Sequence, residues 1–503
     1  MSAATIPNRR VHPGTIVLKM LKDAPSAVFG LPAALAFFSD VGLRWALLAA
    51  VGIATIVLLS KWLAWSRFRY GVGEREIVIE SGILHRNRRS IPFDRVQDVD
   101  IERALLARVF GLAKVRIETG AGGKDEGVLD SVTVAEADRL RAAVRMRRGQ
   151  HVEVAAEDMD VVDAVPSAAP IAGHVLFEMG LRRVLLLGLF SFSLVYIASL
   201  FAFLQTFDKV LPFDIYDPAR WIGLVENNLP ARFTAAAIGF VLFLAILLGV
   251  AAGVLRTLAR DYGFRLSSEG KRFRRERGLF TRTEAMIAKR RVQLALLTSG
   301  PIRGRFGWSG LAFQTLGAGS DGSGVQAAAP LATREEIEPI LADAGPFRLA
   351  PPPELQMVSN RHIVRALAAS VGPALAGVLL GAFFFPPALF LLLLLPLFGA
   401  VAALQRRFHR FALDGDLLFI SRGVWRRRLW VVPVANAQAI SVGRSWLQRR
   451  LGLATVSIDT AGAPAMGGAQ IVDIRASGAE ALAAEIAARR RAHSSGRKSG
   501  TER

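Results

Sequence analysis

Six long apolar runs, arranged in three pairs, limit what this chain can fold into more than any other feature. The pairs are 24–38 with 45–65, 184–204 with 233–255, and 366–385 with 387–404. Most of these runs approach the ~20 apolar residues that an α-helix needs to cross a membrane. They carry no polar stripe, which a surface helix of a soluble protein would show. The pattern predicts three transmembrane hairpins, with a re-entrant first run as an alternative because Pro25 and Pro32 interrupt it.

Lysine and arginine flank these hairpins on one side. They include Lys61 and Arg67 after the first pair, Arg182 and Arg183 before the second, and Arg406 and Arg407 after the third. Such residues concentrate in the cytoplasmic loops of membrane proteins. Both termini and all large polar segments are therefore predicted to be cytoplasmic, in a multi-pass protein of a bacterial inner membrane.

The residues that usually carry chemistry are scarce. The chain has no cysteine and 7 histidines, and no two histidines lie three or four positions apart. A zinc site on one helix is therefore not expected. The Gly-rich stretches 120–124, 317–324 and 461–468 lack the pattern of a phosphate-binding loop. We expect no enzymatic activity, no metal and no cofactor.

The polar segments repeat one another. At an offset of 341 residues, the first and third copies share four positions, namely Gly82, Pro92, Gln97 and Gly111 with Gly423, Pro433, Gln438 and Gly452. At an offset of 196, the second copy matches the first through Gly278, Arg291, Gln293 and Gly307, which correspond to Gly82, Arg95, Gln97 and Gly111. Gapless matches of this kind predict three copies of one small domain.

Local patterns predict the content of each copy. Apolar and polar residues alternate in 96–101 and 115–119, as in half-buried strands. Each copy ends in a helical segment, at 134–146, 333–342 and 477–490. Thr333 and Glu336 have the spacing of an N-terminal capping box. Each copy should therefore be a mostly antiparallel β-domain closed by a helix.

The segment Ile-Pro-Phe-Asp-Arg-Val-Gln-Asp-Val at 91–99, with Arg-Val-Phe-Gly-Leu at 108–112, resembles the bacterial pleckstrin-homology-like (PH-like) membrane domain. Three such domains after transmembrane hairpins resemble the YdbT-like group of membrane proteins. The resemblance implies a bent antiparallel sheet of seven strands with a C-terminal helix in each domain, and a role in protein interactions. The second copy departs from it with Ala288 in place of the proline, and the third with Asn436 in place of the arginine.

These patterns divide the chain into ten segments. The predicted order is a cytoplasmic N-terminus 1–23, hairpin 24–65, PH-like domain 66–147, linker 148–182, hairpin 183–256, PH-like domain 257–343, linker 344–365, hairpin 366–404, PH-like domain 405–490 and a disordered tail 491–503.

The formal net charge of +21 comes partly from basic clusters in the three copies. These are Arg86, Arg88 and Arg89; Lys271, Arg272, Arg274 and Arg275; and Arg426, Arg427 and Arg428. We expect all three at the same hairpin of each domain, forming one positive surface. That surface is either a solvated strand face or a contact for anionic lipid headgroups, at roughly 1 kcal/mol per residue. Nucleic acid is not expected, because few aromatic residues are interleaved for base stacking.

The leading hypothesis is a non-enzymatic scaffold whose PH-like domains bind protein partners or one another, with a homo-oligomer left open. The first alternative is a protein that senses anionic lipid or envelope stress. The second is a transporter subunit, which the near absence of ionisable residues inside the apolar runs disfavours.

Overall fold

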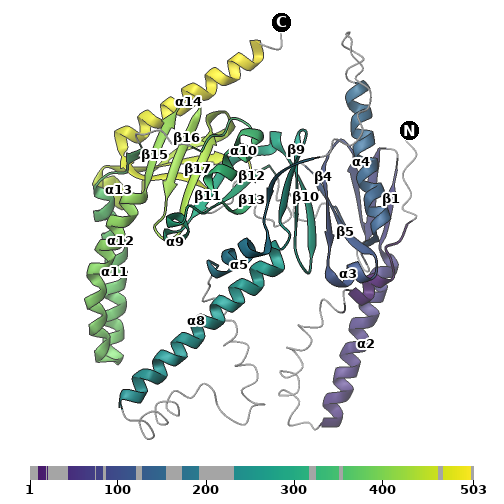
Figure 1. Ribbon diagram of the computed structural model, residues 1–503, viewed down its shortest axis with the longest axis horizontal. Helices are drawn as coiled ribbons and strands as arrows, with labels where there is room; N and C mark the ends of the chain where they lie inside the picture. The colour runs from purple at the N-terminus through teal and green to yellow at the C-terminus, as the bar shows by residue number, and fades with distance from the viewer. Residues whose placement is uncertain are drawn as a thin grey trace.

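The structure is a computed structural model. It describes residues 9–18, 20, 43–73, 75–82, 86–119, 127–154, 173–191, 231–316, 324–349, 355–462 and 468–499. The predicted first run, 24–38, and most of 190–230 lie outside the described residues. The described part contains three β-domains in a row, with the helices of residues 43–67, 231–261 and 361–408 projecting from one side of the row (Figure 1).

Domain 1 consists of two three-stranded groups and a closing helix. The first group is β1 (Arg69–Val72), β2 (Glu76–Ser81) and β3 (Asn87–Pro92). The second is β4 (Val96–Arg103), β5 (Leu112–Thr119) and β6 (Gly127–Thr133), with the short α3 (Leu105–Val109) between β4 and β5. Helix α4 (Val134–Val154) follows β6.

Domain 2 repeats this plan with an additional strand before its membrane segment. Its first group is β7 (His174–Glu178), β8 (Arg265–Glu269), β9 (Arg272–Arg277) and β10 (Arg282–Ala288). After η2 (Lys289–Arg291), the second group is β11 (Val292–Ser299), β12 (Ser309–Thr315) and β13 (Val325–Ala332). The helices are α9 (Pro301–Arg305) and α10 (Arg334–Ala344).

Domain 3 has the same order of elements. Its first group is β14 (Gln356–Met357), β15 (Arg410–Asp414), β16 (Leu417–Arg422) and β17 (Arg427–Pro433). After η4 (Val434–Asn436), the second group is β18 (Ala437–Gly443), β19 (Leu453–Thr460) and β20 (Ala469–Arg475). The helices are α13 (Trp446–Leu451) and α14 (Ala476–Ser499).

The sheets cross the boundaries between domains. One seven-stranded sheet has the order β6-β5-β4-β10-β9-β8-β7, so the second group of domain 1 continues into the first group of domain 2. The other, β13-β12-β11-β17-β16-β15-β14, joins domains 2 and 3 in the same way. The groups β1-β2-β3 and β18-β19-β20 remain three-stranded sheets at the two ends of the row.

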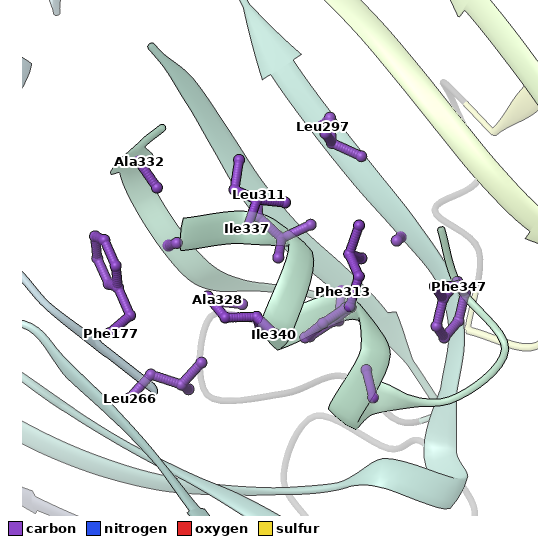
Figure 2. Close-up of a cluster of buried hydrophobic side chains, with 14 of the residues drawn as sticks. Phe177, Leu266, Leu297, Leu311, Phe313, Ala328, Ala332, Ile337, Ile340 and Phe347 are labelled. Atoms are coloured by element: carbon purple, nitrogen blue, oxygen red, sulfur yellow. The ribbon is translucent and has the colours of Figure 1, made fainter. Parts of the chain in front are cut away.

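The core of domain 2 shows how the closing helix covers its sheet. Ile337 and Ile340 of α10 are fully buried against Leu311 and Phe313 of β12 (Figure 2). Phe313 stacks on Phe273 of β9 with ring centroids 5.8 Å apart. Burying a side chain of this size contributes ~1.5–3 kcal/mol. The predicted capping box starts α10, where the Thr333 backbone N–H donates to the Glu336 carboxylate at 3.0 Å.

Among the described residues, three helical segments are long and apolar enough to cross a membrane. They are Phe243–Asp261, Arg361–Phe384 and Pro386–Phe408. The first is part of α8 (Ala231–Asp261), the second is α11, and the third combines η3 (Pro386–Leu394) with α12 (Leu395–Phe408). Helix α2 (Leu43–Arg67) also exposes apolar side chains such as Leu48, Val51 and Ile56.

The chain enters and leaves these membrane segments on neighbouring strands. β7 pairs with β8 and β14 pairs with β15, although α5 (Leu181–Leu189) and α8, or α11 and α12, lie between them in sequence. In domain 1, the bridge between Arg9 and Tyr70 occupies the same place. The chain is therefore paired to the sheet both before and after each membrane segment.

Three expectations differ from the structure. The seven strands of domain 2 and of domain 3 do not form one bent sheet each. Both strand groups of domain 2 pair with a neighbouring domain, whereas in domain 3 the first group pairs with domain 2 and the second remains a separate three-stranded sheet. The predicted linkers 148–182 and 344–365 contain β7 and β14, which gain backbone hydrogen bonds by extending the sheets. Helix α14 continues to Ser499, within the predicted disordered tail 491–503.

Candidate interaction sites

The motif glycines Gly82, Gly278 and Gly423 form tight turns. Their φ angles of 114°, 112° and 107° are rarely adopted by other residues. A Cβ on Gly423 would lie 2.1 Å from the carbonyl oxygen of Arg426, and one on Gly278 would lie 1.9 Å from that of Thr281. These glycines therefore shape the turns into β3, β10 and β17.

The motif glycines Gly111, Gly307 and Gly452 follow the short helices α3, α9 and α13. Their φ angles of 64°, 74° and 63° place them in the left-handed region, where a helix commonly ends. They turn the chain from the helix into the next strand. The structure thus explains both sets of glycines by backbone conformation.

The other motif residues lie where each domain passes from its first strand group to its second. Pro92 and Pro433 end β3 and β17, while Gln97, Gln293 and Gln438 lie in β4, β11 and β18. Arg95 is exposed in this turn, and Arg291 donates to the carbonyl oxygen of Leu316. Asn436, which replaces the motif arginine, donates through Nδ2 to the Gln293 carbonyl at 2.9 Å. In the third copy this position therefore contacts domain 2.

Two of the three basic clusters occupy equivalent places. Arg86, Arg88 and Arg89 lie at the turn into β3 and on it, and Arg426, Arg427 and Arg428 lie at the turn into β17 and on it. Arg427 also stacks its guanidinium 3.8 Å from the ring centroid of Phe408, at the end of α12.

The cluster in domain 2 lies elsewhere, contrary to the expected common surface. Lys271 lies in the turn before β9 and Arg272 begins this strand, one turn earlier in the domain. Arg275 is 1% exposed and donates to the Ala327 carbonyl at 3.4 Å, because alternate positions of β9 face the core. Arg274 lies on the other face and forms ion pairs at 3.0 Å with Glu276 and Glu284. Both arginines therefore have partners within the protein.

The contacts between β4 and β10 and between β11 and β17, here called the first and second joints, have the same register. In the first joint, Arg282 is opposite Arg103 and Glu284 is opposite Ile101. In the second joint, the equivalent pairs are Arg427 with Ser299 and Leu429 with Leu297. The two joints thus repeat one geometric relation between successive domains.

Side chains reinforce both joints. In the first, Arg141 of α4 donates to Glu284 at 2.8 Å and to the Val99 carbonyl at 3.3 Å. In the second, buried Gln314 donates to Thr460 Oγ1 at 2.8 Å and to the Ala461 carbonyl at 3.2 Å. Because buried polar groups here have partners across the boundary, separating the domains would leave them unsatisfied.

Among the described strands, β3 and β18 are edge strands that lack the cross-domain partner which the corresponding strands of the joints have, and they lie in the domains at opposite ends of the row. β3 corresponds to β10 and β17, and β18 corresponds to β4 and β11. Val442 of β18 is 36% exposed, whereas Ile101 and Leu297, at the same position of the joints, are 1% and 8% exposed. The β3 edge and the β18 edge therefore correspond to the two strands of a joint, without a partner strand among the described strands.

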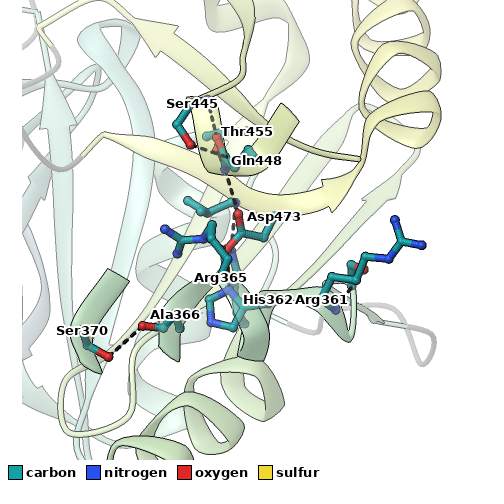
Figure 3. Close-up of polar contacts among 12 residues, drawn as sticks. Arg361, His362, Arg365, Ala366, Ser370, Ser445, Gln448, Thr455 and Asp473 are labelled. Atoms are coloured by element: carbon teal, nitrogen blue, oxygen red, sulfur yellow. Dashed lines mark hydrogen bonds and ion pairs between the residues drawn. The ribbon is translucent and has the colours of Figure 1, made fainter. Parts of the chain in front are cut away.

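A buried polar cluster connects domain 3 to the start of α11 (Figure 3). Asp473 of β20 is completely buried, and its Oδ2 lies 2.6 Å from His362 Nδ1. Arg365 Nε donates to the same oxygen at 2.5 Å, and Gln448 donates to Oδ1 at 2.7 Å. A capping box between Ser445 and Gln448 starts α13 and holds Gln448 in place.

The surroundings of Asp473 and His409 shift the pKa values of both groups. Burial disfavours ionisation of Asp473, but hydrogen bonds from His362 and Gln448 and the charge of Arg365 outweigh it and hold the pKa of the carboxyl below its ordinary value. Burial, aided by the charges of Arg422 and His362, lowers the pKa of His409 to about 4. His409 is therefore neutral at neutral pH, and its Nε2 accepts a bond from the Val472 backbone at 3.4 Å.

Next to this cluster lies a cavity of about 240 Å³ between the base of α11 and α12 and the start of β17. Arg365, Arg422, His362, His409 and Trp425 contribute to its lining. Nε2 of His362 is buried there without a hydrogen-bond partner among the described residues. The lining combines fixed positive charge with an aromatic side chain.

Sequence reasoning missed the joints and the Asp473 cluster. The only local signal for the cluster was His362 and Arg365 three residues apart at the start of an apolar run, which places both on one face of a helix. The joints had no local signal, because their strands are about 180 or 130 residues apart.

Comparison with known proteins gives a consistent result. A family model described as "Bacterial PH domain" matches residues 26–148, 218–344 and 364–490, which together make up most of the chain. The chain is 24% identical over 466 residues to the UPF0699 transmembrane protein YdbT of Bacillus subtilis (strain 168), covering 89% of this chain and 92% of that protein.

A shorter match links one part of the chain to a second protein of that organism, the UPF0699 transmembrane protein YdbS. The identity is 36% over 92 residues, which is 18% of this chain and 55% of the relative. No solved structure matches the chain.

Proposed function

Because this chain belongs to the bacterial PH domain family and is a YdbT-like membrane protein with three such domains, we propose that it is a membrane-anchored scaffold. In this proposal the three domains act as one platform for protein partners at the cytoplasmic face of the inner membrane. The chain performs no catalysis of its own.

The continuous sheets are the observation that carries this proposal. Domains joined only by linkers would move independently, but two backbone-paired joints with buried cross-contacts hold these domains at fixed spacing. The long apolar helices extend from one side of the row, so the row can lie parallel to a membrane (Figure 1). Such an arrangement offers its free strand edges for β-strand addition by a partner.

Site-specific photocrosslinking in cells tests the scaffold. A photoreactive amino acid is placed at Asn87 on β3 or Gly443 on β18, and a control copy carries it at Ser299 in the second joint. Discrete adducts with another polypeptide are expected from the edge positions, and adducts only within the chain from Ser299. Absence of adducts from both edge positions would contradict the scaffold.

Anionic headgroup binding is a second candidate function, favoured by the cavity beside the Asp473 cluster. Its lining places Arg365 and Arg422 near the base of two apolar helices, where a phosphate group of the inner leaflet would lie. Native mass spectrometry of purified protein should show retained phosphatidylglycerol in preference to phosphatidylethanolamine. Arg422→Gln should remove this preference, and Arg410→Gln, outside the cavity lining, serves as the control. Equal retention in all three proteins would exclude the cavity as a headgroup site.

A further inference from the structure

We infer that the partner of the free edges is a second copy of this chain, with β18 of one copy pairing antiparallel with β3 of the next. This inference rests on the proposed scaffold and names one occupant for its edges. The resulting contact would be a third joint, between domain 3 of one copy and domain 1 of another. The two joints within the chain already repeat one geometric relation.

The register of the third joint follows from those two. Domain 3 is offset from domain 2 by 145 residues, so Leu297 and Ser299 of β11 correspond to Val442 and Arg444. Glu284 of β10 corresponds to Arg88 of β3 at the offset of 196. The expected opposite pairs are therefore Val442 with Arg88, Gly443 with Asn87, and Ser441 with Arg89.

The charges of the side chains on β3 and β18 are compatible with pairing. β17 presents Arg427 and Arg428 to the neutral Ser299 and Thr298 in the second joint. In the same way, the basic β3 would face the neutral stretch Ile440–Gly443. The same register places Arg444 opposite Arg86, as Arg103 lies opposite Arg282 in the first joint, so one like-charged pair at this position is compatible with a joint. Pairing of β3 with β3 of another copy would instead bring together all the arginines of two basic strands, which is unfavourable.

The surroundings of β18 leave the required stretch open. Helix α14 packs near this strand, and Arg490 donates to the Gln438 carbonyl at 2.8 Å. Gln438 corresponds to Gln293, which precedes the residues that pair in the second joint. From Ala439 to Gly443, most residues of β18 are exposed. The contact from α14 therefore lies beside the expected joint.

The copies must be different molecules. Domains 1 and 3 lie at opposite ends of the row, so β18 cannot reach β3 of its own chain (Figure 1). Repeating the relation of the first two joints keeps the membrane helices of the next copy on the same side. A head-to-tail contact of this type generates a ring if the rotation closes and a filament if it does not.

Cysteine pairing in native membranes provides the test, because the natural chain contains no cysteine. Arg88→Cys in one tagged copy and Val442→Cys in a differently tagged copy are produced in the same cells and oxidised. The expected product is a covalent dimer carrying both tags. Arg89→Cys with Val442→Cys is the matched control, since neighbouring residues of a strand point to opposite faces; it should yield little dimer.

A charge exchange checks that the dimer reflects this register. Val442→Arg should reduce disulfide formation between Asn87→Cys and Gly443→Cys by about five-fold, because it faces Arg88. Adding Arg88→Glu should restore it. Equal dimer from Arg88→Cys and Arg89→Cys, or no rescue by Arg88→Glu, would overturn the third joint.

The two proposals can fail separately. If the edges capture a different protein but never a second copy, the self-association is wrong and the scaffold stands. If the edges capture nothing, both fail.

Discussion

Asp473 illustrates how one residue holds a membrane segment to its domain. Its carboxylate accepts bonds from Arg365 and Gln448 and contacts His362, so it connects α11 with α13 and β20. Removal of one partner from a buried ion pair is costly, because the remaining charge has lost its compensation.

Asp473→Asn should therefore lower the free energy of unfolding by about 3 kcal/mol. Denaturant titration of the full chain in detergent measures the change. Asp459→Asn is a suitable control, since Asp459 is exposed on the neighbouring strand β19. Equal stability of the two variants would mean that the Asp473 cluster contributes nothing net.

His409 should make stability depend on pH between about 4 and 6.5. Its folded-state pKa of about 4 lies below the ~6.5 of an unfolded histidine, so in this range the unfolded chain binds a proton that the folded chain does not. Stability is therefore complete above pH ~6.5 and falls as the pH falls toward 4.

His409→Gln removes this proton uptake. Between pH 7 and pH 4, the natural chain should lose about 3 kcal/mol more than the variant. Denaturant titrations at several pH values give the comparison, and parallel curves for the two proteins would contradict the assignment. The Asp473 carboxyl, with its lowered pKa, contributes only at more acidic pH.

At the scale of the element, the packing of α5 on α8 depends on a glycine. A Cβ on Gly188 would lie 2.6 Å from the Cα of Val254, so the two backbones approach too closely for any side chain. Small residues at such contacts are common between helices in membranes.

Gly188→Leu should separate these helices and cost about 1–3 kcal/mol. Gly239→Leu on α8 is the matched control, since a Cβ there meets nothing within 4 Å. Thermal unfolding of the full chain in detergent compares the three proteins. Equal midpoints for Gly188→Leu and the natural chain would show that the contact is not needed.

At the scale of the whole molecule, the joints make the folding of neighbouring domains interdependent. Leu297 is part of the domain 2 core, yet it lies opposite Leu429 of domain 3. A disturbance in one domain should therefore reach the next through backbone pairs.

Leu297→Lys should increase amide hydrogen exchange in both β11 and β17 by at least about ten-fold, because it buries a charge in the joint. Asp459→Lys is the control, at an exposed position of β19 that lies outside the joints. It should leave exchange within domain 3 unchanged. Faster exchange confined to β11 would mean that the two domains fold independently.

The sequence by itself determined the repeat, the apolar segments and the strand and helix content of each domain. These features depend on local periodicity, on turn glycines such as Gly423 and on capping residues such as Thr333, all of which lie close together along the chain. The motif residues could be located from the pattern, although their backbone roles could not be read from it.

The tertiary structure alone decided how the domains combine. One edge of β10 pairs with β9 of its own domain, and the other pairs with β4 of domain 1. The second pairing joins residues about 180 positions apart, and alternating hydrophobicity does not specify which strand a given strand will pair with. The same holds for Asp473 of β20, whose partners come from two other segments, α11 and α13. Arg275 and Arg88 have the same charge in similar basic clusters, and only the packing of the sheets buries one and leaves the other at an edge.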